Sequence, residues 1–578
     1  MEKKESYTSD PQAFINYVSE ETSKLLEMYS ATGGDDIFRQ FTNSWTELAT
    51  KSLEDPTVWI KAIADYQQAH LNLWKNLLTG ASEQVAQPVP GDRRFQNEEW
   101  SKNPIFDYIK QSYLLSSKML TEMASNAKLS EKEQKKLEFY TQQFVDAMSP
   151  TNFAMTNPEV LNQALETKGQ SLVDGLKNLL GDIDKGHISM TDESAFELGR
   201  NIAMTEGAVV FQNDLFQLIH YKPEAEQVFE KPLLIVPPSI NKFYILDLQP
   251  HNSYVKFCVE QGYNVFLVAW VNPSKEMSHL SWDDYVERGV LKAVEVTKEI
   301  AEQDKINAVA WCVGGTLMAT AMAVMANRKD TSIASATFLT TLTDFKDPGD
   351  LKVFIDEYQV KSLAEKVNKE GILHGRELAT SFNMLRSNDL IWSYVVNNYL
   401  KGQTPPPFDI LYWNSDPTNL PARMYTFYLN KMYLENKLVE PGGVTICGEP
   451  IDLSKIKTPC YFLSTIEDHI APWKSTFSAT ETFKGQLEFV LGASGHVAGV
   501  INPASKNRRH YWIKGELGKG PDHWLETAEK QEGSWWTHWS EWLKRRAGKK
   551  VDAPKDYGNA TFTPIEPAPG SYVKARLD

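Results

Sequence analysis

The period of the apolar residues changes along the chain. From about residue 10 to 190, apolar side chains recur at steps of three and four, as on one face of a helix, and strand signals are scarce. A polar segment from Glu83, EQVAQPVPGDRR, predicts a linker between helical pieces. These apolar helix faces indicate packing between helices, with a partner-binding surface as the alternative. They predict helices over residues 104–124 and along Trp59, Ile60, Ile63, Tyr66, Leu71, Trp74, Leu77 and Leu78.

From about residue 205 the pattern changes to short β-rich runs that alternate with amphipathic helices, such as 283–302. The runs are almost continuously apolar, which is typical of parallel strands covered on both faces. We therefore expect a parallel α/β sheet. Its predicted strands are 232–236, 265–271, 306–311, 333–339, 460–464 and 487–491.

The regular spacing of strands stops after Phe345. A stretch of about 346–459 follows, with helical character near 378–398 and a proline-rich run, GQTPPPFD, from Gly402. An insertion of this size predicts a lid over the sheet. The expected organisation is a helical N-terminal domain over 1–193 and an α/β domain over 194–578 that carries the lid.

Composition excludes several classes of function. The net charge of −15 argues against a nucleic-acid binder, which needs a basic surface. The four cysteines form no CxxC pair, so neither a zinc site nor a disulfide framework is predicted, and so few thiols suit the cytoplasm. The N-terminal MEKKESYTSDP precedes no apolar run, and no stretch reaches the roughly 18 apolar residues of a membrane span.

The run INAVAWCVGGTL, from Ile306, carries the chemistry. An apolar strand ends at Cys312 and a helix follows at once, which is the layout of a nucleophile elbow. Gly314 supplies the small residue that the tight turn needs, whereas Ala310 stands where glycine is usual. The helix N-terminus favours the thiolate, and the Val313 amide would donate to an oxyanion. The alternative is a buried structural cysteine.

Two further side chains complete a catalytic triad. Asp468, in LSTIEDHIAPW, and His496, in LGASGHVAGVINP, each follow a predicted strand. Nucleophile, acid and base therefore occur in the chain order of α/β-hydrolases. Glu467 and His469 are the rival candidates beside Asp468.

A second oxyanion donor is expected in the loop after an earlier strand. The segment LLIVPPSINKFYILD, from Leu233, ends a strand at Val236 and continues through two prolines. We predict Ile240 as the donor, with a plain proline turn as the alternative.

At these residues the chain resembles the class I polyhydroxyalkanoate synthases, which polymerise 3-hydroxyacyl-CoA into storage polyester. The resemblance spans nearly the whole chain, and Ala310 is its departure. The matching motifs are DRRFQNEEWSKNPIFDYIKQSYLL from Asp92, TDESAFELGRNIA from Thr191, IVPPSINKFYILDLQPHNS from Ile235, AWCVGGT from Ala310, LYWNSDPTNLP from Leu411, EDHIAPW from Glu467, SGHVAGVINP from Ser494 and GSWW from Gly533.

The resemblance implies that Cys312 carries the acyl group, with Asp468 and His496 as acid and base. It implies short-chain (R)-3-hydroxyacyl-CoA, chiefly 3-hydroxybutyryl-CoA, as substrate, a growing polyester chain, and Arg386 near the CoA phosphates. It also implies a cytoplasmic homodimer on polyester granules, whose N-terminal domain serves dimerisation and granule association, with no metal or cofactor. The alternatives are a thiol hydrolase (a polyester depolymerase or thioesterase) and a non-enzymatic granule-coat protein.

Overall fold

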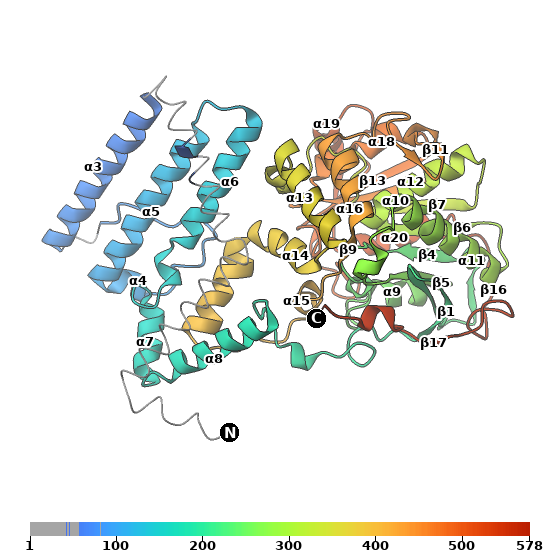
Figure 1. The fold of residues 1–578 in the computed structure, drawn as a ribbon, viewed down its shortest axis with the longest axis horizontal. Helices are drawn as coiled ribbons and strands as arrows, with labels where there is room; N and C mark the ends of the chain where they lie inside the picture. The colour runs from blue at the N-terminus through green and yellow to red at the C-terminus, as the bar shows by residue number, and fades with distance from the viewer. Residues whose placement is uncertain (1–41, 43–44, 47–56, 81–82, 578) are drawn as a thin grey trace. The chain divides into compact units, whose positions relative to one another are not determined.

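The computed structural model describes residues 42, 45–46, 57–80 and 83–577 of the 578-residue chain (Figure 1). The helical pattern expected between residues 10 and 56 lies almost entirely outside these residues. The chain divides into two compact units. One contains the described residues up to Asp192 together with Thr380–Pro406, and the other contains Glu193–Ala379 and Pro407–Asp578.

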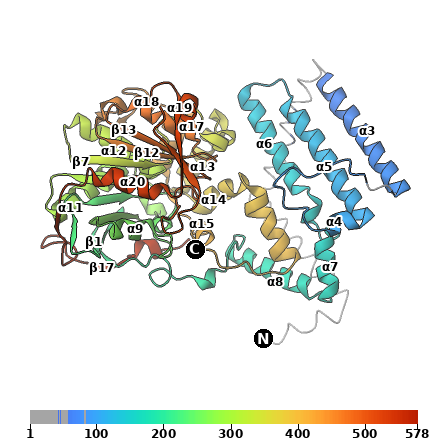
Figure 2. The same ribbon diagram turned by 180° about the vertical axis from the view of Figure 1, so that it is seen from behind.

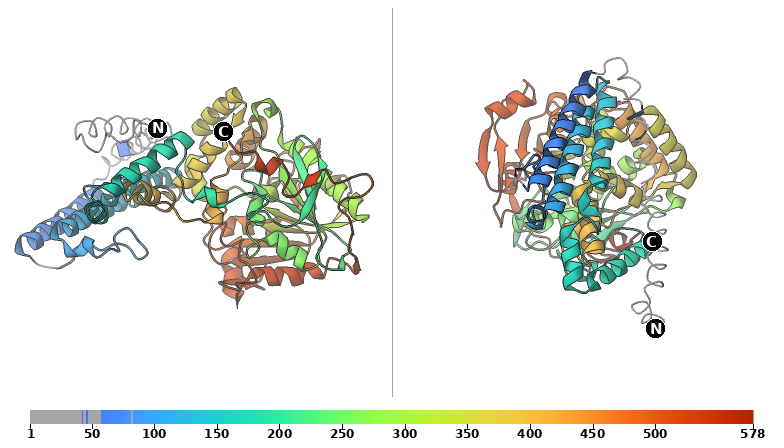
Figure 3. Two further views of the ribbon diagram at one scale, coloured as in Figure 1. Left: turned by 90° about the horizontal axis from the view of Figure 1, so that it is seen from below. Right: turned by 90° about the vertical axis from the view of Figure 1, so that its left-hand side faces the viewer.

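Three long helices of the first unit pack side by side: α3 (Thr57–Thr79), α5 (Pro104–Ser125) and α6 (Glu131–Ala147) (Figure 3). The two predicted helices are thus confirmed as α3 and α5. Helix α5 begins where Asn103 accepts from an amide of the first turn, with proline at the first helical position. Ser130 starts α6 through a capping box.

The first unit also contains η7 (Asn388–Trp392) and η8 (Val395–Leu400), which the sequence assigned to the lid insertion. Helix α8 (Gln170–Lys185) packs against η8, and Tyr399 donates to Asp182 at 2.7 Å. Ser387 and Asn388 donate to the buried Asp146 at 2.8 and 2.7 Å. These buried polar contacts attach 380–406 to the helical unit, although the segment lies far away in the sequence.

The second unit is built on an 11-stranded sheet, in which all six predicted strands are present and parallel. The hairpin of β1 (Gly207–Gln212) and β2 (Phe216–Tyr221), which the sequence analysis did not name, extends one side, with the short β17 (Glu566–Pro567) outside it. The antiparallel β14 (His510–Ile513) and β15 (Glu529–Glu532) extend the other side. The central order is β13 (Leu487–Gly492), β12 (Cys460–Thr465), β7 (Ile333–Leu339), β6 (Ile306–Trp311), β4 (Leu233–Val236) and β5 (Val265–Trp270).

Helices cover both faces of this sheet, so its strands bury every residue of β4, β5 and β6. One core contains α11 (Lys292–Ala301) and α12 (Val313–Asn327), and the other contains α9 (Tyr254–Glu260) and the tryptophan-rich α20 (Trp535–Lys544) (Figure 2). The predicted α/β-hydrolase fold, preceded by a helical region, is confirmed.

The predicted helix 283–302 begins as α10 (Trp282–Asp284) and continues into α11 through a π-helical segment, Tyr285–Leu291. Among the described residues, no helix combines the length and the apolar character needed to cross a bilayer.

His220 is buried in β2 as a neutral imidazole. Its Nδ1 accepts from the Gly558 amide at 3.1 Å and its Nε2 lies 2.7 Å from Asn264 Oδ1, while the ring stacks on Phe266. A protonated ring could not accept at Nδ1. Burial lowers the pKa of His220 to about 4, although the Asn264 hydrogen bond opposes the shift.

Candidate active site

Cys312 occupies a sharp turn between β6 and α12. Its backbone has φ 52° and ψ −124°, a strained conformation for a residue with a side chain. The turn is held because the Cys312 amide donates to Leu339 O at 2.9 Å and the Cys312 carbonyl accepts from Gly315 at 2.9 Å. The turn therefore has the strained geometry of a nucleophile elbow.

The elbow depends on close backbone approach at Gly314. A Cβ at Gly314 would clash with the carbonyl oxygens of Val236 and Pro237, where β4 ends. Ala310 is buried within β6 and pairs with Val236 on β4. Its methyl group is thus accommodated inside the sheet, and the elbow keeps its glycine on the helix side.

Asp468 and His496 meet at the carboxyl ends of β12 and β13. His496 Nδ1 lies 2.6 Å from Asp468 Oδ2, and the two side chains are 12% and 0% exposed. The other carboxylate oxygen accepts from the Ile470 and Ala471 amides at 2.9 and 2.8 Å. These two amides fix the orientation of the carboxylate toward the imidazole.

The rival residues face other partners. Glu467 is exposed, and its charge acts on Arg509. His469 pairs with Asp350, with 3.0 Å between Nδ1 and Oδ2. The structure thus selects Asp468 as the carboxylate that contacts His496.

The Cys312 side chain lies close enough to the His496 imidazole for its charge to act on the imidazole. Burial alone would lower the pKa of His496, but the charges of Asp468 and then Cys312 outweigh burial and raise this pKa well above its usual value. A protonated imidazole next to the sulfur stabilises a thiolate. The three side chains can therefore act as nucleophile, base and orienting acid.

Two backbone amides were predicted as oxyanion donors. Val313 is the first residue of α12, so its N–H has no partner within the helix. Ile240 follows β4, and its carbonyl accepts from the Thr418 amide at 3.1 Å. Within the part of the chain that the structure describes, the Ile240 N–H donates no hydrogen bond. Arg386 is an exposed turn residue of the first unit, so its contact with CoA stays a prediction.

Three aromatic neighbours of the triad were not predicted from the sequence. Tyr428 and Tyr433, from the π-helical segment η9 (Tyr428–Leu434), lie close enough to Cys312 for its charge to act on them. Burial raises the pKa of both phenols, and Cys312 adds to the rise. The ring of Trp311 lies 6.3 Å from the His496 ring. Aromatic residues at helical spacing indicate only packing, so no sequence signal singled out these tyrosines.

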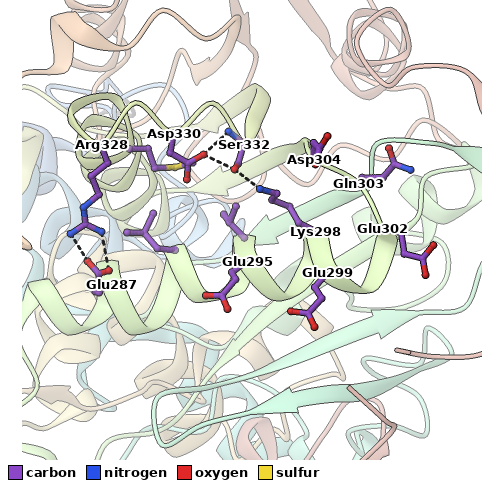
Figure 4. Close-up of a pocket in the computed structure, with 13 residues that line it drawn as sticks. Glu287, Glu295, Lys298, Glu299, Glu302, Gln303, Asp304, Arg328, Asp330 and Ser332 are labelled. Carbon is purple, nitrogen blue, oxygen red and sulfur yellow. Dashed lines mark hydrogen bonds and ion pairs between the residues drawn. The ribbon is translucent and has the colours of Figure 1, made fainter. Parts of the chain in front are cut away.

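A surface pocket of about 530 Å³ lies away from this site (Figure 4). Asp304 and Ser332, which line it, precede β6 and β7, whereas Cys312 follows the opposite end of β6. Some of its polar side chains pair with one another, as Lys298 does with Ser332 and Arg328 with Glu287. In the described residues, no group of three or more His, Cys, Asp or Glu side chains could hold a metal ion.

Comparison with known proteins matches both parts of the chain. Residues 91–258 match the family described as poly-beta-hydroxybutyrate polymerase (PhaC) N-terminus, and residues 232–503 match the α/β hydrolase fold family.

Two curated relatives match over most of their length. The chain is 49% identical to a poly(3-hydroxyalkanoate) polymerase subunit PhaC of Cupriavidus necator, over 89% of this chain and 88% of the relative. It is 42% identical to a poly(3-hydroxyalkanoate) polymerase of Methylorubrum extorquens, over 96% of this chain and 92% of the relative.

Proposed function

Because the chain belongs to the poly(3-hydroxyalkanoate) polymerase family, we propose that it polymerises short-chain (R)-3-hydroxyacyl-CoA, chiefly 3-hydroxybutyryl-CoA, through an acyl-cysteine at Cys312. The observation that carries the proposal is a strained elbow cysteine whose charge acts on the His496 imidazole, which a fully buried carboxylate orients. Membership of this family makes the chain an enzyme that transfers an acyl group.

Chain growth begins with transfer of the Cys312 proton to His496. The thiolate attacks the thioester carbonyl, and the Val313 and Ile240 amides stabilise the resulting oxyanion. The carbon–sulfur bond to CoA breaks, and His496 returns the proton to the CoA sulfur. Because its pKa is raised, the His496 imidazole can hold this proton from the deprotonation of Cys312 until CoA leaves.

His496 then acts as base a second time. It takes the proton of a 3-hydroxyl group, whose oxygen attacks the acyl-cysteine and forms an ester while the Cys312 thiolate leaves. General base catalysis of this kind contributes roughly 100- to 10,000-fold. Water competes with the hydroxyl group. The buried Tyr428 and the partly buried Tyr433, on whose phenols the charge of Cys312 acts, support a role of the insertion in excluding water.

The same family membership supports a homodimer that associates with polyester granules in the cytoplasm. An exposed apolar face of α3 supports a surface role for the helical unit, since large apolar residues there remain open to solvent. The exposed residues of this face are Ile60, Leu71, Trp74 and Leu78, which are 62%, 64%, 49% and 79% exposed.

The test of the proposal measures CoA release and product from 3-hydroxybutyryl-CoA. The wild-type protein should release CoA and form polymer, and Cys312→Ala should do neither. Cys460→Ala is the matched control, because Cys460 is buried in β12 within the hydrophobic core. Free hydroxy acid in place of polymer would instead indicate a thiol hydrolase, and CoA release by Cys312→Ala would refute the acyl-cysteine.

A further inference from the structure

The loop after β4 has little means of holding its own shape. It leaves the strand through Pro237 and Pro238, which carry no N–H to donate. Its carbonyls are instead held from outside, because Thr418 donates to Ser239 O at 3.0 Å through its hydroxyl and to Ile240 O through its amide. The position of the Ile240 amide therefore depends on chain segments that are remote in the sequence.

A buried ion pair anchors the end of this loop. Lys242 Nζ lies 2.7 Å from Asp416 Oδ1, and the two side chains are 3% and 2% exposed. Tyr244 donates to the other Asp416 oxygen at 2.9 Å, and Trp413 donates to the Lys242 carbonyl at 2.8 Å. Burial lowers the pKa of Lys242, and the Asp416 charge opposes that shift.

The last residues of the chain complete the cage around this ammonium group. Lys242 also donates to the carbonyl of Ala575 at 2.8 Å. Arg576 lies over the Tyr412 ring, 4.7 Å from its centroid, and its Nε is 4.0 Å from Asp416 Oδ2. We call residues 571–577 the C-terminal strap.

The strap is itself fixed to the sheet side of the unit. Its short helix η11 (Tyr572–Lys574) buries Val573 in the core that contains Tyr244 and Trp413. Tyr572 donates to Asn213 O at 2.6 Å through its hydroxyl. The Lys242 ammonium group thus connects the packed C-terminal strap to the loop that carries Ile240.

We infer that the C-terminal strap and the Lys242–Asp416 pair are positioning elements of the reaction, which hold the Ile240 amide where the oxyanion forms. The inference rests on the proposed function. Neither Lys242 nor Asp416 has to touch the substrate. They act by fixing the position of the Ile240 amide, two residues upstream of Lys242. This amide must donate to an oxyanion whose charge is present only in the transition state.

Two substitutions loosen this arrangement. Lys242→Met removes the ammonium group that joins Ala575 to Asp416. Arg576→Met weakens the strap at a 42% exposed side chain and leaves the buried pair in place, so it tests the inference even where Lys242→Met fails to fold. Lys222→Met is the matched control, because Lys222 pairs with Glu206 at an exposed site of the same unit.

The kinetic readout separates positioning from general damage. Displacing a reacting group by 1 Å costs about 100-fold, so Lys242→Met should lower kcat about 10- to 100-fold. Arg576→Met should produce a smaller fall, and KM should stay within about twofold in both. Alkylation of Cys312 by iodoacetamide should keep its wild-type rate, because the triad is intact. Wild-type kcat in both variants, or parallel loss of alkylation, would overturn the inference.

Hydrogen exchange decides the same question without turnover. Amides of residues 240–244 should exchange at least about tenfold faster in both variants than in the wild type or Lys222→Met. Unchanged exchange rates of these amides would refute the positioning role of the C-terminal strap. A wild-type protein that releases no CoA would refute the proposed function alone, because the exchange measurement still tests the contact between strap and loop.

Discussion

Replacing Asp468 by asparagine tests how the triad works. The Ile470 and Ala471 amides both donate to Asp468 Oδ1, so that position must remain an oxygen. The new amide nitrogen would therefore face His496 Nδ1. Two donors cannot pair, so the imidazole would have to place its proton on Nε2, where it can no longer accept the proton of Cys312.

The size of the effect follows from the charge and from the tautomer. Opposite unit charges separated by the 2.6 Å between His496 Nδ1 and Asp468 Oδ2 attract by at most about 6 kcal/mol at an effective dielectric constant of about 20. A wrong tautomer in a triad of this kind lowers turnover about 10,000-fold, or about 5.5 kcal/mol. We expect Asp468→Asn to lower CoA release by about that factor.

The pH dependence of Cys312 alkylation gives a second measurement. In the wild type the raised pKa of His496 favours a protonated imidazole at neutral pH, and we expect this positive charge to promote alkylation of Cys312. Asp468→Asn lowers that pKa, so alkylation at pH 7 should fall and recover only as the pH rises. Asp350→Asn, at the neighbouring His469 pair, is the matched control and should change neither rate. Less than a tenfold loss of CoA release in Asp468→Asn would refute this account.

Three further changes have defined outcomes. Gly314→Ala should abolish CoA release and destabilise the fold by about 1–3 kcal/mol in urea unfolding, because its Cβ meets backbone carbonyls; wild-type activity would contradict the elbow packing. His220 is neutral in the folded protein, so the free energy of unfolding should fall by about 3 kcal/mol as the pH is lowered from 6.5 to 4. His220→Gln should not show this loss, and an equal dependence of stability on pH in the two proteins would refute the prediction. Ser387→Ala removes a hydrogen bond to the Asp146 carboxylate and should lower stability by about 1.5–3 kcal/mol, whereas no change in urea unfolding would refute that contribution.

The parallel strands and the elbow were predictable because each has a local signature. Continuous apolar runs revealed the buried strands, and the strand–Cys312–Gly314 sequence revealed the turn. The order of Asp468 and His496 along the chain then indicated which side chains would meet.

Other features depend on tertiary contacts that no local pattern reveals. Residues 380–406 have an ordinary helical period, which does not say whether they pack on the sheet or on the helical unit; the buried Asp146 and Asp182 decide that. The sequence indicates no more than a core aromatic residue at Tyr428, although the charge of Cys312 acts on its phenol. Lys242 reads as a surface lysine, and only its distant partners explain its burial.

The discontinuity of the helical unit has a consequence for biosynthesis. Because residues 380–406 complete this unit, its last helical segments leave the ribosome about 10–40 s after Asp192, at ordinary elongation rates. By then β4, β5, β6 and β7 have already been synthesised. The described residues up to Asp192 must therefore wait for a segment from the middle of the polypeptide before their packing is complete, and until then they are open to chaperones and proteases.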